Sequence, residues 1–348
     1  MRALLFQSIG RVSYERIADP ARADPGDAIV RVLRASVCGS DLHVYHGREA
    51  GLDPGTVMGH EFVGEVVDVG PAVRAFWRGD MVVSPFSTAC GQCEPCDRRL
   101  SARCTSGALF GWVQGGVGLQ GAQAELVRVP FADATLVRVP EGLDLDVALL
   151  LGDVLPTGLY CAQRAEVGPG GVCVVVGCGP VGLAAVLAAR DHHPDQLFAV
   201  DAIPERLALA ARFGATPLDL NAGDVVDRVL AATRGFGADA VLEAVGNPAS
   251  SRLAWQIVRP GGVVSAVGVH NEAQFAFTPM DAYDKNLTYR IGRCPARSLM
   301  PQLLPWVQSR RQDAAALITH RMPLEQGAAA YALFDAKRDG CIKVVLRP

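Results

Sequence analysis

Residues 172–182 read Val-Cys-Val-Val-Val-Gly-Cys-Gly-Pro-Val-Gly, an apolar run followed by glycines spaced as G-x-G-x-x-G. The run Val172–Val176 predicts a fully buried strand of a parallel sheet, and the following Leu183–Arg190 is typical of a helix. Glycines in such a turn let a pyrophosphate approach the helix N-terminus, where free N–H groups and the helix dipole favour negative charge. This stretch therefore predicts a dinucleotide-binding βαβ unit.

A second apolar run, Leu197–Val200, ends at Asp201, which follows Gly177 by 24 residues. An acidic side chain at this place is positioned to bind ribose hydroxyls, and it repels a 2′-phosphate, so NAD is favoured over NADP. The alternative is that Asp201 caps a helix starting near Pro204. We expect the cofactor role, because strand, glycine turn and acidic end occur in this order.

Strand and helix patterns alternate from about residue 170 to 295. Apolar runs at Ala240–Leu242 and Val263–Val267 predict strands that end near Gly246 and Gly268, where ligands of open parallel sheets bind. Earlier in the chain, short runs separated by Gly and Pro predict the strands of a barrel-like β domain, at Ile29–Leu33, Phe62–Val69 and Ala124–Val129. The expected fold is α/β, with a doubly wound parallel sheet and a separate β-rich domain.

The composition is that of a folded protein with about two domains, because half of the 348 residues are hydrophobic. The 33 basic and 36 acidic residues give a net charge of -3, which argues against binding to nucleic acid or to an anionic membrane. Val167–Ala189 is uncharged over a membrane-spanning length, but its six glycines and two prolines favour a strand, a turn and a helix. The first residues lack a signal-peptide pattern, so we expect a cytoplasmic protein.

Four of the ten cysteines lie close together in a segment rich in Gly, Pro and charged residues: Cys90, Cys93, Cys96 and Cys104. Without a secretion signal, such a cluster indicates metal binding rather than disulfides. Four thiolates form a closed tetrahedral zinc site, whose role is to fold a lobe of the protein. An iron–sulfur cluster is the alternative, since ferredoxins use similar spacing. The long gap before Cys104 and the lack of a second set favour zinc.

A second metal-binding set is spread along the first half of the chain. Cys38 opens the string Cys-Gly-Ser-Asp-Leu-His, His60 lies in Gly-His-Glu, and Asp153 interrupts an apolar run just before Pro156. Each has an ordinary alternative: a core cysteine, a histidine in a turn, or an aspartate that caps the next helix. Together they supply a thiolate, an imidazole and a carboxylate, a three-ligand zinc set that leaves a fourth position for water or substrate.

These motifs resemble the zinc-dependent medium-chain alcohol dehydrogenase family, essentially from end to end. The resemblance implies a GroES-like β-barrel catalytic domain over residues 1–155, with a structural-zinc lobe at about 88–106. It also implies a Rossmann NAD-binding domain over residues 156–295 and a C-terminal segment, 296–348, that returns to the catalytic domain. The catalytic-zinc ligands would be Cys38, His60 and Asp153, with Glu61 as a conditional ligand. The four clustered cysteines would hold the structural zinc.

The family pattern implies roles for neighbouring residues as well. Ser40 would touch the substrate oxygen and pass its proton toward His43, while Asp41 would orient the ring of His60. Arg206 would cover the adenine, although an arginine there can also accept a 2′-phosphate. The residues expected to bind the cofactor are Gly177, Gly179, Pro180, Val181, Gly182, Asp201, Arg206, Gly246, Val267, Gly268 and Arg293.

The function that this resemblance implies is hydride transfer between an alcohol and NAD, which gives an aldehyde or a ketone. One zinc would be catalytic and one structural, and the enzyme would be a homodimer or a homotetramer. A zinc-independent quinone or enoyl reductase is one alternative, but it would lack the three-ligand set. A nonenzymatic zinc module that binds nucleic acid is another, and the net charge argues against it. The glycine-rich stretch 109–121 is either a pocket wall or a flexible surface loop.

Overall fold

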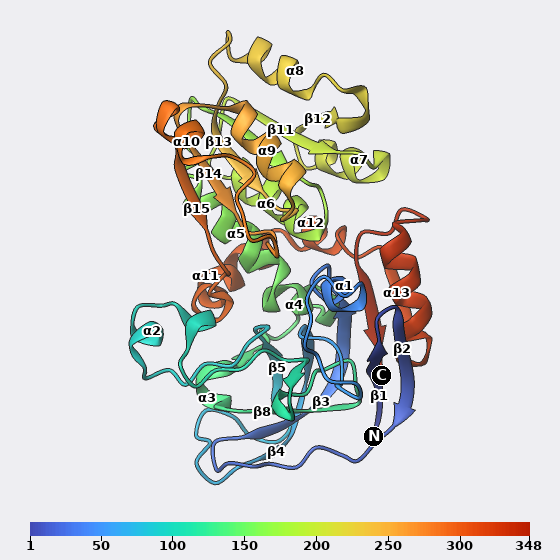
Figure 1. Cartoon of the computed structure of the whole chain (residues 1–348). Helices are drawn as coiled ribbons and strands as arrows, with labels where there is room; N and C mark the ends of the chain where they lie inside the picture. Colours follow the sequence, from blue (N-terminus) through green and yellow to red (C-terminus); the bar gives the residue numbers. More distant parts are fainter. The chain divides into compact units, whose positions relative to one another are not determined.

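The computed structural model describes residues 1–348 and divides them into two compact units (Figure 1). Unit 1 comprises Met1–Pro156 together with Pro295–Pro348, and unit 2 comprises Thr157–Cys294. The last part of the chain therefore belongs to the same unit as the first part.

Unit 2 is built on a six-stranded parallel sheet with the order β12-β11-β10-β13-β14-β15. The strand order reverses between β10 and β13, and ligands of such sheets bind outside the carboxyl ends of the strands at this point. The strands are β10 (Val172–Val176), β11 (Gln196–Asp201), β12 (Thr216–Asp219), β13 (Ala238–Glu243), β14 (Val258–Ala266) and β15 (Thr288–Ile291).

The helices that accompany this sheet alternate with its strands along the chain, beginning with one helix before β10, as in a doubly wound fold. They are α5 (Val154–Arg164), α6 (Pro180–Arg190), α7 (Pro204–Arg212), η3 (Leu220–Ala222), α8 (Val225–Ala232), α9 (Pro248–Ile257) and α10 (Pro279–Asp284). The predicted doubly wound domain is therefore confirmed. The predicted helix at Leu183 begins earlier, because Pro180 fits the first helical turn, where no N–H is needed.

Strand β14 is longer than the predicted run Val263–Val267. It begins at Val258 and includes Pro260, Gly261 and Gly262, residues that read as a turn in the sequence. Its first residue pairs with Ala238, and the pairing register shifts before Ala240. An irregularity of this kind lets a strand contain proline and glycine without losing its neighbour.

Unit 1 contains a seven-stranded sheet with the order β16-β17-β3-β4-β5-β9, and β8 pairs with β3. Two hairpins, β1–β2 and β6–β7, complete the strands. The bounds are β1 (Arg2–Ser8), β2 (Arg11–Arg16), β3 (Ala28–Val37), β4 (Phe62–Val69), β5 (Met81–Ser84), β6 (Trp112–Gln114), β7 (Val117–Leu119), β8 (Leu126–Val129), β9 (Val137–Arg138), β16 (His320–Pro323) and β17 (Val344–Arg347).

The helices of unit 1 are short except for two near the C-terminus. They are α1 (Asp41–Tyr45), α2 (Glu94–Asp97), η1 (Ser101–Arg103), α3 (Ala132–Thr135), α4 (Leu145–Leu149), η2 (Leu150–Gly152), α11 (Ala296–Ser309), α12 (Arg311–Ala315), η4 (Leu324–Gln326) and α13 (Gly327–Ala336). Strand β17 pairs antiparallel with β3, so the end of the chain joins the sheet that begins near residue 28.

The carboxylate of Asp146 ties the C-terminal strands to the rest of this unit. It lies in α4 and accepts from Arg34 of β3 at 2.6 Å and from Arg321 of β16 at 2.5 Å, and Arg347 of β17 lies at 3.6 Å. Burial opposes ionisation of Asp146, but the hydrogen bonds from Arg321 and Arg34 lower its pKa. The charged carboxylate therefore stabilises the junction of four elements.

The glycine-rich stretch 109–121 forms the β6–β7 hairpin rather than an irregular loop. Phe110 is buried at its start, and its ring meets that of Phe62 edge to face with centroids 5.2 Å apart. The stretch therefore contains regular strands that the sequence did not predict. Sequence periodicity misses strands of three residues because they contain little more than one alternation.

No single helix of the chain is long and apolar enough to cross a membrane. One bent pair, Leu145–Gly152 with Val154–Arg164, would pass that test by length and composition alone. The uncharged stretch Val167–Ala189 is divided between β10, the glycine turn and α6, as predicted from its glycines and prolines.

Candidate active site

Unit 1 brings together four side chains that can bind a metal: Cys38, His60, Glu61 and Asp153. One ligand atom from each lies within 4.8 Å of those of the other three. Cys38 directly follows β3, His60 and Glu61 directly precede β4, and Asp153 lies between η2 and α5. Because β3 and β4 are antiparallel neighbours, the end of one strand and the start of the next meet at the same edge of the sheet.

The distances within this cluster suit a tetrahedral ion. Oδ2 of Asp153 lies 3.6 Å from Sγ of Cys38 and 3.4 Å from Nε2 of His60. Zinc bonds of about 2.0–2.3 Å separate tetrahedral ligand atoms by roughly 3.3–3.8 Å. The side chain of Asp153 is thus directed at the other ligands, and the following helix begins at Val154.

The pKa values in the cluster are those of a site that favours a cation. Burial and the Glu61 carboxylate raise the pKa of the Cys38 thiol. Burial opposes protonation of His60, but the Asp41 and Asp153 carboxylates raise its pKa well above the usual range. These groups crowd negative charge into a buried place, and a bound divalent cation relieves that crowding. The donor set therefore fits zinc.

Glu61 is held by Ser36 of β3 and by Lys343, which directly precedes β17. It is 1% exposed and forms an ion pair with Lys343, which is 0% exposed, while Ser36 donates a hydrogen bond to the same carboxylate oxygen. The second oxygen, Oε1, is buried without a hydrogen-bond partner. An unpaired buried carboxylate oxygen is costly, and a neighbouring cation would satisfy it.

The predicted auxiliary residues surround His60. Nδ1 of His60 lies 3.3 Å from Oδ1 of Asp41, and Nε2 lies 3.3 Å from Oγ of Ser40. Ser40 is the N-cap residue of α1, and the backbone N–H of His43 donates to the carbonyl oxygen of Ser40. The structure therefore places Ser40 and Asp41 on the two nitrogens of His60, with His43 one turn further along.

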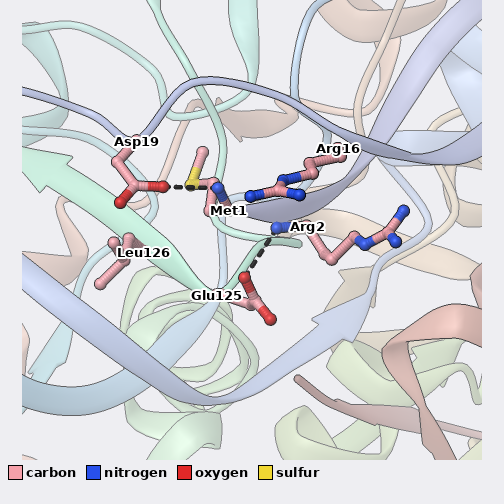
Figure 2. A pocket seen from close by; sticks show the side chains of 6 residues that line it. All are labelled: Met1, Arg2, Arg16, Asp19, Glu125 and Leu126. Atoms are coloured by element: carbon pink, nitrogen blue, oxygen red, sulfur yellow. Dashed lines mark hydrogen bonds and ion pairs between the residues drawn. The ribbon is translucent and has the colours of Figure 1, made fainter.

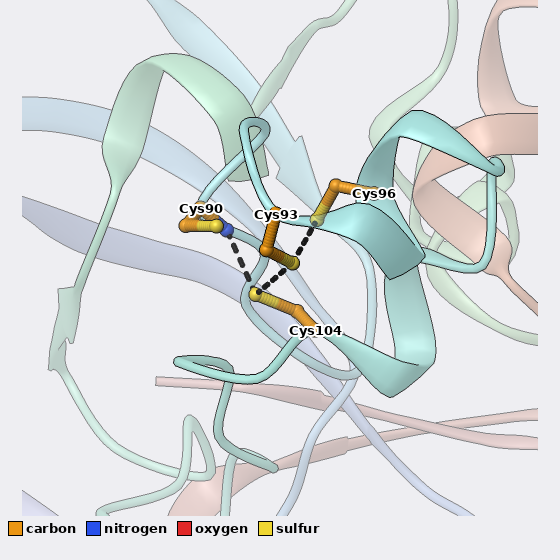
Figure 3. Close-up of side chains that lie close together, drawn as sticks. All are labelled: Cys90, Cys93, Cys96 and Cys104. Carbon is orange, nitrogen blue, oxygen red and sulfur yellow. Dashed lines mark hydrogen bonds between the residues drawn. The ribbon is translucent and has the colours of Figure 1, made fainter.

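The four clustered cysteines also converge (Figure 3). Sγ of Cys93 lies 3.5 Å from Sγ of Cys96 and 3.8 Å from Sγ of Cys104, and zinc–sulfur bonds of about 2.3 Å place tetrahedral sulfurs about 3.8 Å apart. Backbone hydrogen bonds from Thr105 and Cys96 lower the pKa of Cys93 to about 6, whereas burial raises that of Cys96 to about 12. A structural zinc would hold all four as thiolates.

In unit 2 the glycine turn leads into α6 as the motif requires. Gly177 has a φ of +89°, and a Cβ on Gly182 would lie 1.7 Å from the carbonyl oxygen of Gly177. Gly179 is the N-cap residue of α6, and Pro180 and Val181 occupy its first turn. No larger residue fits at Gly182, so the turn remains narrow and its backbone open to a phosphate.

Asp201 lies at the end of β11, but its carboxylate already accepts three backbone hydrogen bonds. Oδ2 accepts from Cys178 at 2.7 Å, and Oδ1 accepts from Ala202 at 2.8 Å and Ile203 at 3.0 Å. Helix α7 has Ile203 as its N-cap residue, so the alternative that Asp201 caps this helix is wrong. The carboxylate instead joins the glycine turn to the end of β11, and Nη1 of Arg206 lies 3.8 Å from it.

Two family models match the chain. One describes an alcohol dehydrogenase GroES-like domain and matches residues 24–141, and the other describes a zinc-binding dehydrogenase and matches residues 180–309. The chain is 42% identical over 346 residues to the zinc-type alcohol dehydrogenase B of Aspergillus flavus, with 97% of this chain and 79% of that protein covered. The chain belongs to the zinc-dependent medium-chain alcohol dehydrogenase family.

Other proteins similar to this dehydrogenase are also alcohol dehydrogenases. The structure of alcohol dehydrogenase TADH from Thermus sp. ATN1 superimposes with a TM-score of 0.93 at 41% identity, covering 100% of this chain and 99% of that one. The NADP-dependent isopropanol dehydrogenase of Thermoanaerobacter brockii is 32% identical over 325 residues, with 92% of each chain covered. The protein is therefore a zinc alcohol oxidoreductase with a GroES-like and a Rossmann-type part, and the zinc-independent and nonenzymatic alternatives are set aside.

The remaining predicted cofactor residues of this dehydrogenase lie after β13, β14 and β15. A Cβ on Gly268 would lie 2.2 Å from the backbone nitrogen of Gly246, so the turns after β13 and β14 pack backbone to backbone. Glu243 holds both turns, because Oε1 accepts from the N–H of Gly246 at 2.8 Å and Oε2 lies 3.3 Å from Nε2 of His270. Val267 donates to the carbonyl of Glu243, and Arg293 follows β15.

Three buried residues beside the metal-binding cluster of unit 1 carry no prediction from the sequence: Lys343, Gln123 and Tyr331. All are 0% exposed. A charge inside the run Cys-Ile-Lys-Val-Val-Leu is a signal that could have found Lys343, since buried charges need partners. Gln123 and Tyr331 carry no such mark, because single amides and phenols are common in cores.

The dehydrogenase also has a shallow hollow beside its N-terminus, away from the predicted ligands. The terminal ammonium of Met1 lies 2.5 Å from Oδ1 of Asp19, and the backbone N–H of Arg2 donates to Glu125 (Figure 2). None of the predicted site residues lines it; the lining is Met1, Arg2, Arg16, Asp19, Glu125 and Leu126.

Proposed function

We propose that this dehydrogenase uses NAD and that Cys38, His60 and Asp153 hold its catalytic zinc. The convergence of a thiolate, an imidazole and a carboxylate on one point supports the proposal. Three protein ligands leave one tetrahedral position for substrate, whereas the four cysteines form a closed set suited to a structural ion. Glu61, whose Oε1 has no partner, is a conditional fourth ligand.

The neighbouring residues would transfer the substrate proton and orient the ring of His60. Zinc supplies Lewis acidity toward the oxygen of an alcohol or carbonyl. Ser40 lies beside the metal-facing nitrogen of His60, so its hydroxyl is placed to accept the substrate proton and pass it toward His43. Asp41 holds the opposite nitrogen of His60 and keeps the ring in place.

The cofactor would lie across the carboxyl edge of the unit 2 sheet. The pyrophosphate would meet the free N–H groups at the start of α6, beside Gly177, Gly179 and Gly182. Asp201 and Arg206 would bind the ribose and cover the adenine. The turns that carry Gly246, Val267, Gly268 and Arg293 would line the remaining length of the cofactor.

The absorbance of the reduced nicotinamide tests in one assay whether the enzyme oxidises alcohols and which cofactor it uses. Zinc-replete protein is mixed with NAD or NADP and with primary, secondary, polyol and aromatic alcohols. We expect reduction of NAD that is lost on chelation and restored by zinc. Reduction of NADP alone would contradict the NAD proposal, and zinc-independent turnover would contradict the catalytic-zinc proposal.

The substitution Asp201→Asn is expected to move the kcat/KM ratio of NAD over NADP by about tenfold or more toward NADP. The carboxylate repels a 2′-phosphate, and like charges brought together cost several kcal/mol, of which about 1.4 make a factor of ten. The amide keeps one oxygen as an acceptor for the N–H groups of the turn. Asp219→Asn, at the paired position of the next strand, is the matched control. An unchanged ratio in Asp201→Asn would remove Asp201 from cofactor selection.

We also propose that the enzyme is a homo-oligomer, either a dimer or a tetramer. Strand β15 is the last strand of its sheet, and apolar side chains are exposed on it and just before it: Ile291 at 42%, Phe275 at 62%, Met280 at 70% and Tyr283 at 82%. An open edge with such a patch favours pairing with another chain. Light scattering should give a multiple of the 36.8 kDa chain mass. A monomer mass at micromolar concentration would contradict the proposal.

The compartment proposed for the enzyme is a reducing one such as the cytoplasm. None of the ten cysteines forms a disulfide, and those of both metal sets must stay reduced to bind zinc.

A further inference from the structure

A row of buried polar side chains leads away from His60 on the side opposite the metal ligands. Asp41 faces Nδ1 of His60 with Oδ1, and its Oδ2 accepts from the backbone N–H of Cys38 at 3.0 Å and from Nε2 of Gln123 at 3.3 Å. Both carboxylate oxygens of Asp41 are therefore engaged. The side chain is 5% exposed, so water does not replace these partners.

Gln123 is engaged at both ends of its amide. Nε2 also donates to the carbonyl oxygen of Ser36 at 3.0 Å, and Oε1 accepts from the hydroxyl of Tyr331 at 2.9 Å. A backbone carbonyl accepts only, so the nitrogen of the amide must be the end that faces Ser36 and Asp41. Gln123 therefore donates to Asp41 and fixes the position of its carboxylate.

The position of Gln123 is fixed by packing against the residue before His60. Gly59 has a φ of +88°, and a Cβ on it would lie 2.4 Å from Cγ of Gln123. Gln123 thus lies directly over the turn that carries His60. Tyr331, which holds the far end of the amide, comes from α13, and its ring lies 5.6 Å from that of Tyr45 in α1.

The hydrogen bonds of the row Tyr331–Gln123–Asp41 all run toward Asp41, because Tyr331 donates to Gln123 and Gln123 donates to Asp41. Oδ1 of Asp41 faces Nδ1 of His60 and is placed to accept a hydrogen bond from an Nδ1–H, in which case the lone pair of the neutral imidazole is on Nε2. Nε2 is the atom that faces Asp153, 3.4 Å away. The row Tyr331–Gln123–Asp41 therefore favours the tautomer of His60 that can bind a metal through Nε2.

We propose that Gln123 and Tyr331 are positioning residues of the catalytic metal site, acting through Asp41 on the ring of His60. The inference rests on the proposed zinc role of Cys38, His60 and Asp153. A buried amide and phenol contribute little net stability that a well-packed apolar pair could not supply. Their specific contribution is the fixed direction of the hydrogen bonds.

The test uses Gln123→Met, which keeps the length of the side chain but removes the donor to Asp41, and Tyr331→Phe, which removes one oxygen. Zinc affinity is measured by competition with a chromophoric chelator on the full chain. We expect Gln123→Met to lower the affinity for one of the two zinc ions by roughly 10–100-fold. Tyr331→Phe should lower the affinity for the same ion by a smaller factor. The zinc of the four cysteines should keep its affinity in both variants.

Replacing zinc by cobalt at the site of Cys38, His60 and Asp153 gives a second readout. We expect Gln123→Met to shift the visible ligand-field bands of bound cobalt, because a changed His60 ring alters the coordination geometry. Thr56→Val is the matched control: Thr56 is 1% exposed in the same unit, and its hydroxyl donates to the carbonyl of Asp53. Thr56→Val should lose stability without changing the affinity or the cobalt spectrum.

Each outcome decides between the two claims. If the wild-type chain binds only the four-cysteine zinc, the proposed catalytic site fails and this inference fails with it. If the wild type binds both ions and Gln123→Met keeps wild-type affinity and spectrum, the inference alone is overturned. The inference is also overturned if Gln123→Met and Thr56→Val have equal melting temperatures and Gln123→Met loses no more zinc affinity than Thr56→Val. Should Gln123→Met fail to fold, Tyr331→Phe decides by the same two readouts.

Discussion

Replacing Asp153 by alanine is expected to lower kcat/KM for alcohol oxidation by more than about two orders of magnitude. Asp153 supplies the carboxylate of the three-ligand set, and its Oδ2 lies within 3.6 Å of both Cys38 and His60. Without it, two protein ligands remain in an open site, too few to hold a catalytic zinc. Metal analysis should find about one zinc ion per chain instead of about two.

The control for this experiment is Asp133→Ala. The carboxylate of Asp133 accepts backbone hydrogen bonds from Arg74 and Ala75 on the surface of the same unit. This variant should keep its zinc and its turnover. Normal activity with both zinc ions in Asp153→Ala would exclude Asp153 as a ligand and leave Glu61 as the carboxylate of the site.

Cys93→Ser is expected to remove the other zinc and to destabilise the chain. Sγ of Cys93 lies within 3.8 Å of two further sulfurs, so it is central to the four-cysteine set. The lobe that carries these cysteines has only α2 and η1 as regular elements and few buried side chains, so zinc supplies much of its folding energy. A loss of several kcal/mol corresponds to a fall in melting temperature of roughly 5–10 °C.

Glu94→Ala tests whether the effect belongs to the metal. Glu94 lies in the same lobe, and its ion pair with Arg98 is largely exposed, so its loss should change stability by less than about 0.5 kcal/mol. Unchanged zinc content and melting temperature in Cys93→Ser would contradict a structural zinc. Iron and sulfide in the purified wild-type protein would favour the iron–sulfur alternative.

The sequence predicted the parts of the molecule that depend on neighbouring residues. The run Val172–Val176, its glycine turn and Asp201 are close in the chain, and each has a local pattern with few alternatives. The same holds for the four clustered cysteines. The set Cys38, His60 and Asp153 is spread over more than 100 residues, so no periodicity marks it; the donor chemistry of its members and the resemblance to the family's motifs indicate it.

The residues that sequence reasoning missed depend on long-range contacts. Gln123 meets Ser36 and Tyr331, which are 87 and 208 residues away, and Lys343 meets Glu61 across 282 residues. No local pattern encodes such pairs. The start of β14 is not predicted for another reason, because proline and glycine in a strand look the same in sequence as in a turn. The strands of the β6–β7 hairpin are too short to show an alternation.

The contacts of the C-terminal elements with the metal-binding cluster of unit 1 join parts of the chain that are far apart in sequence. Lys343 and Tyr331 reach Glu61 and Gln123 only after β17 and α13 have joined the sheet of unit 1. Closing contacts of such large sequence separation is slow compared with forming local turns. We therefore expect the thiolate, imidazole and carboxylates of the cluster to come together before Lys343 reaches Glu61. The restraint on Glu61 is then completed only when the last strand docks.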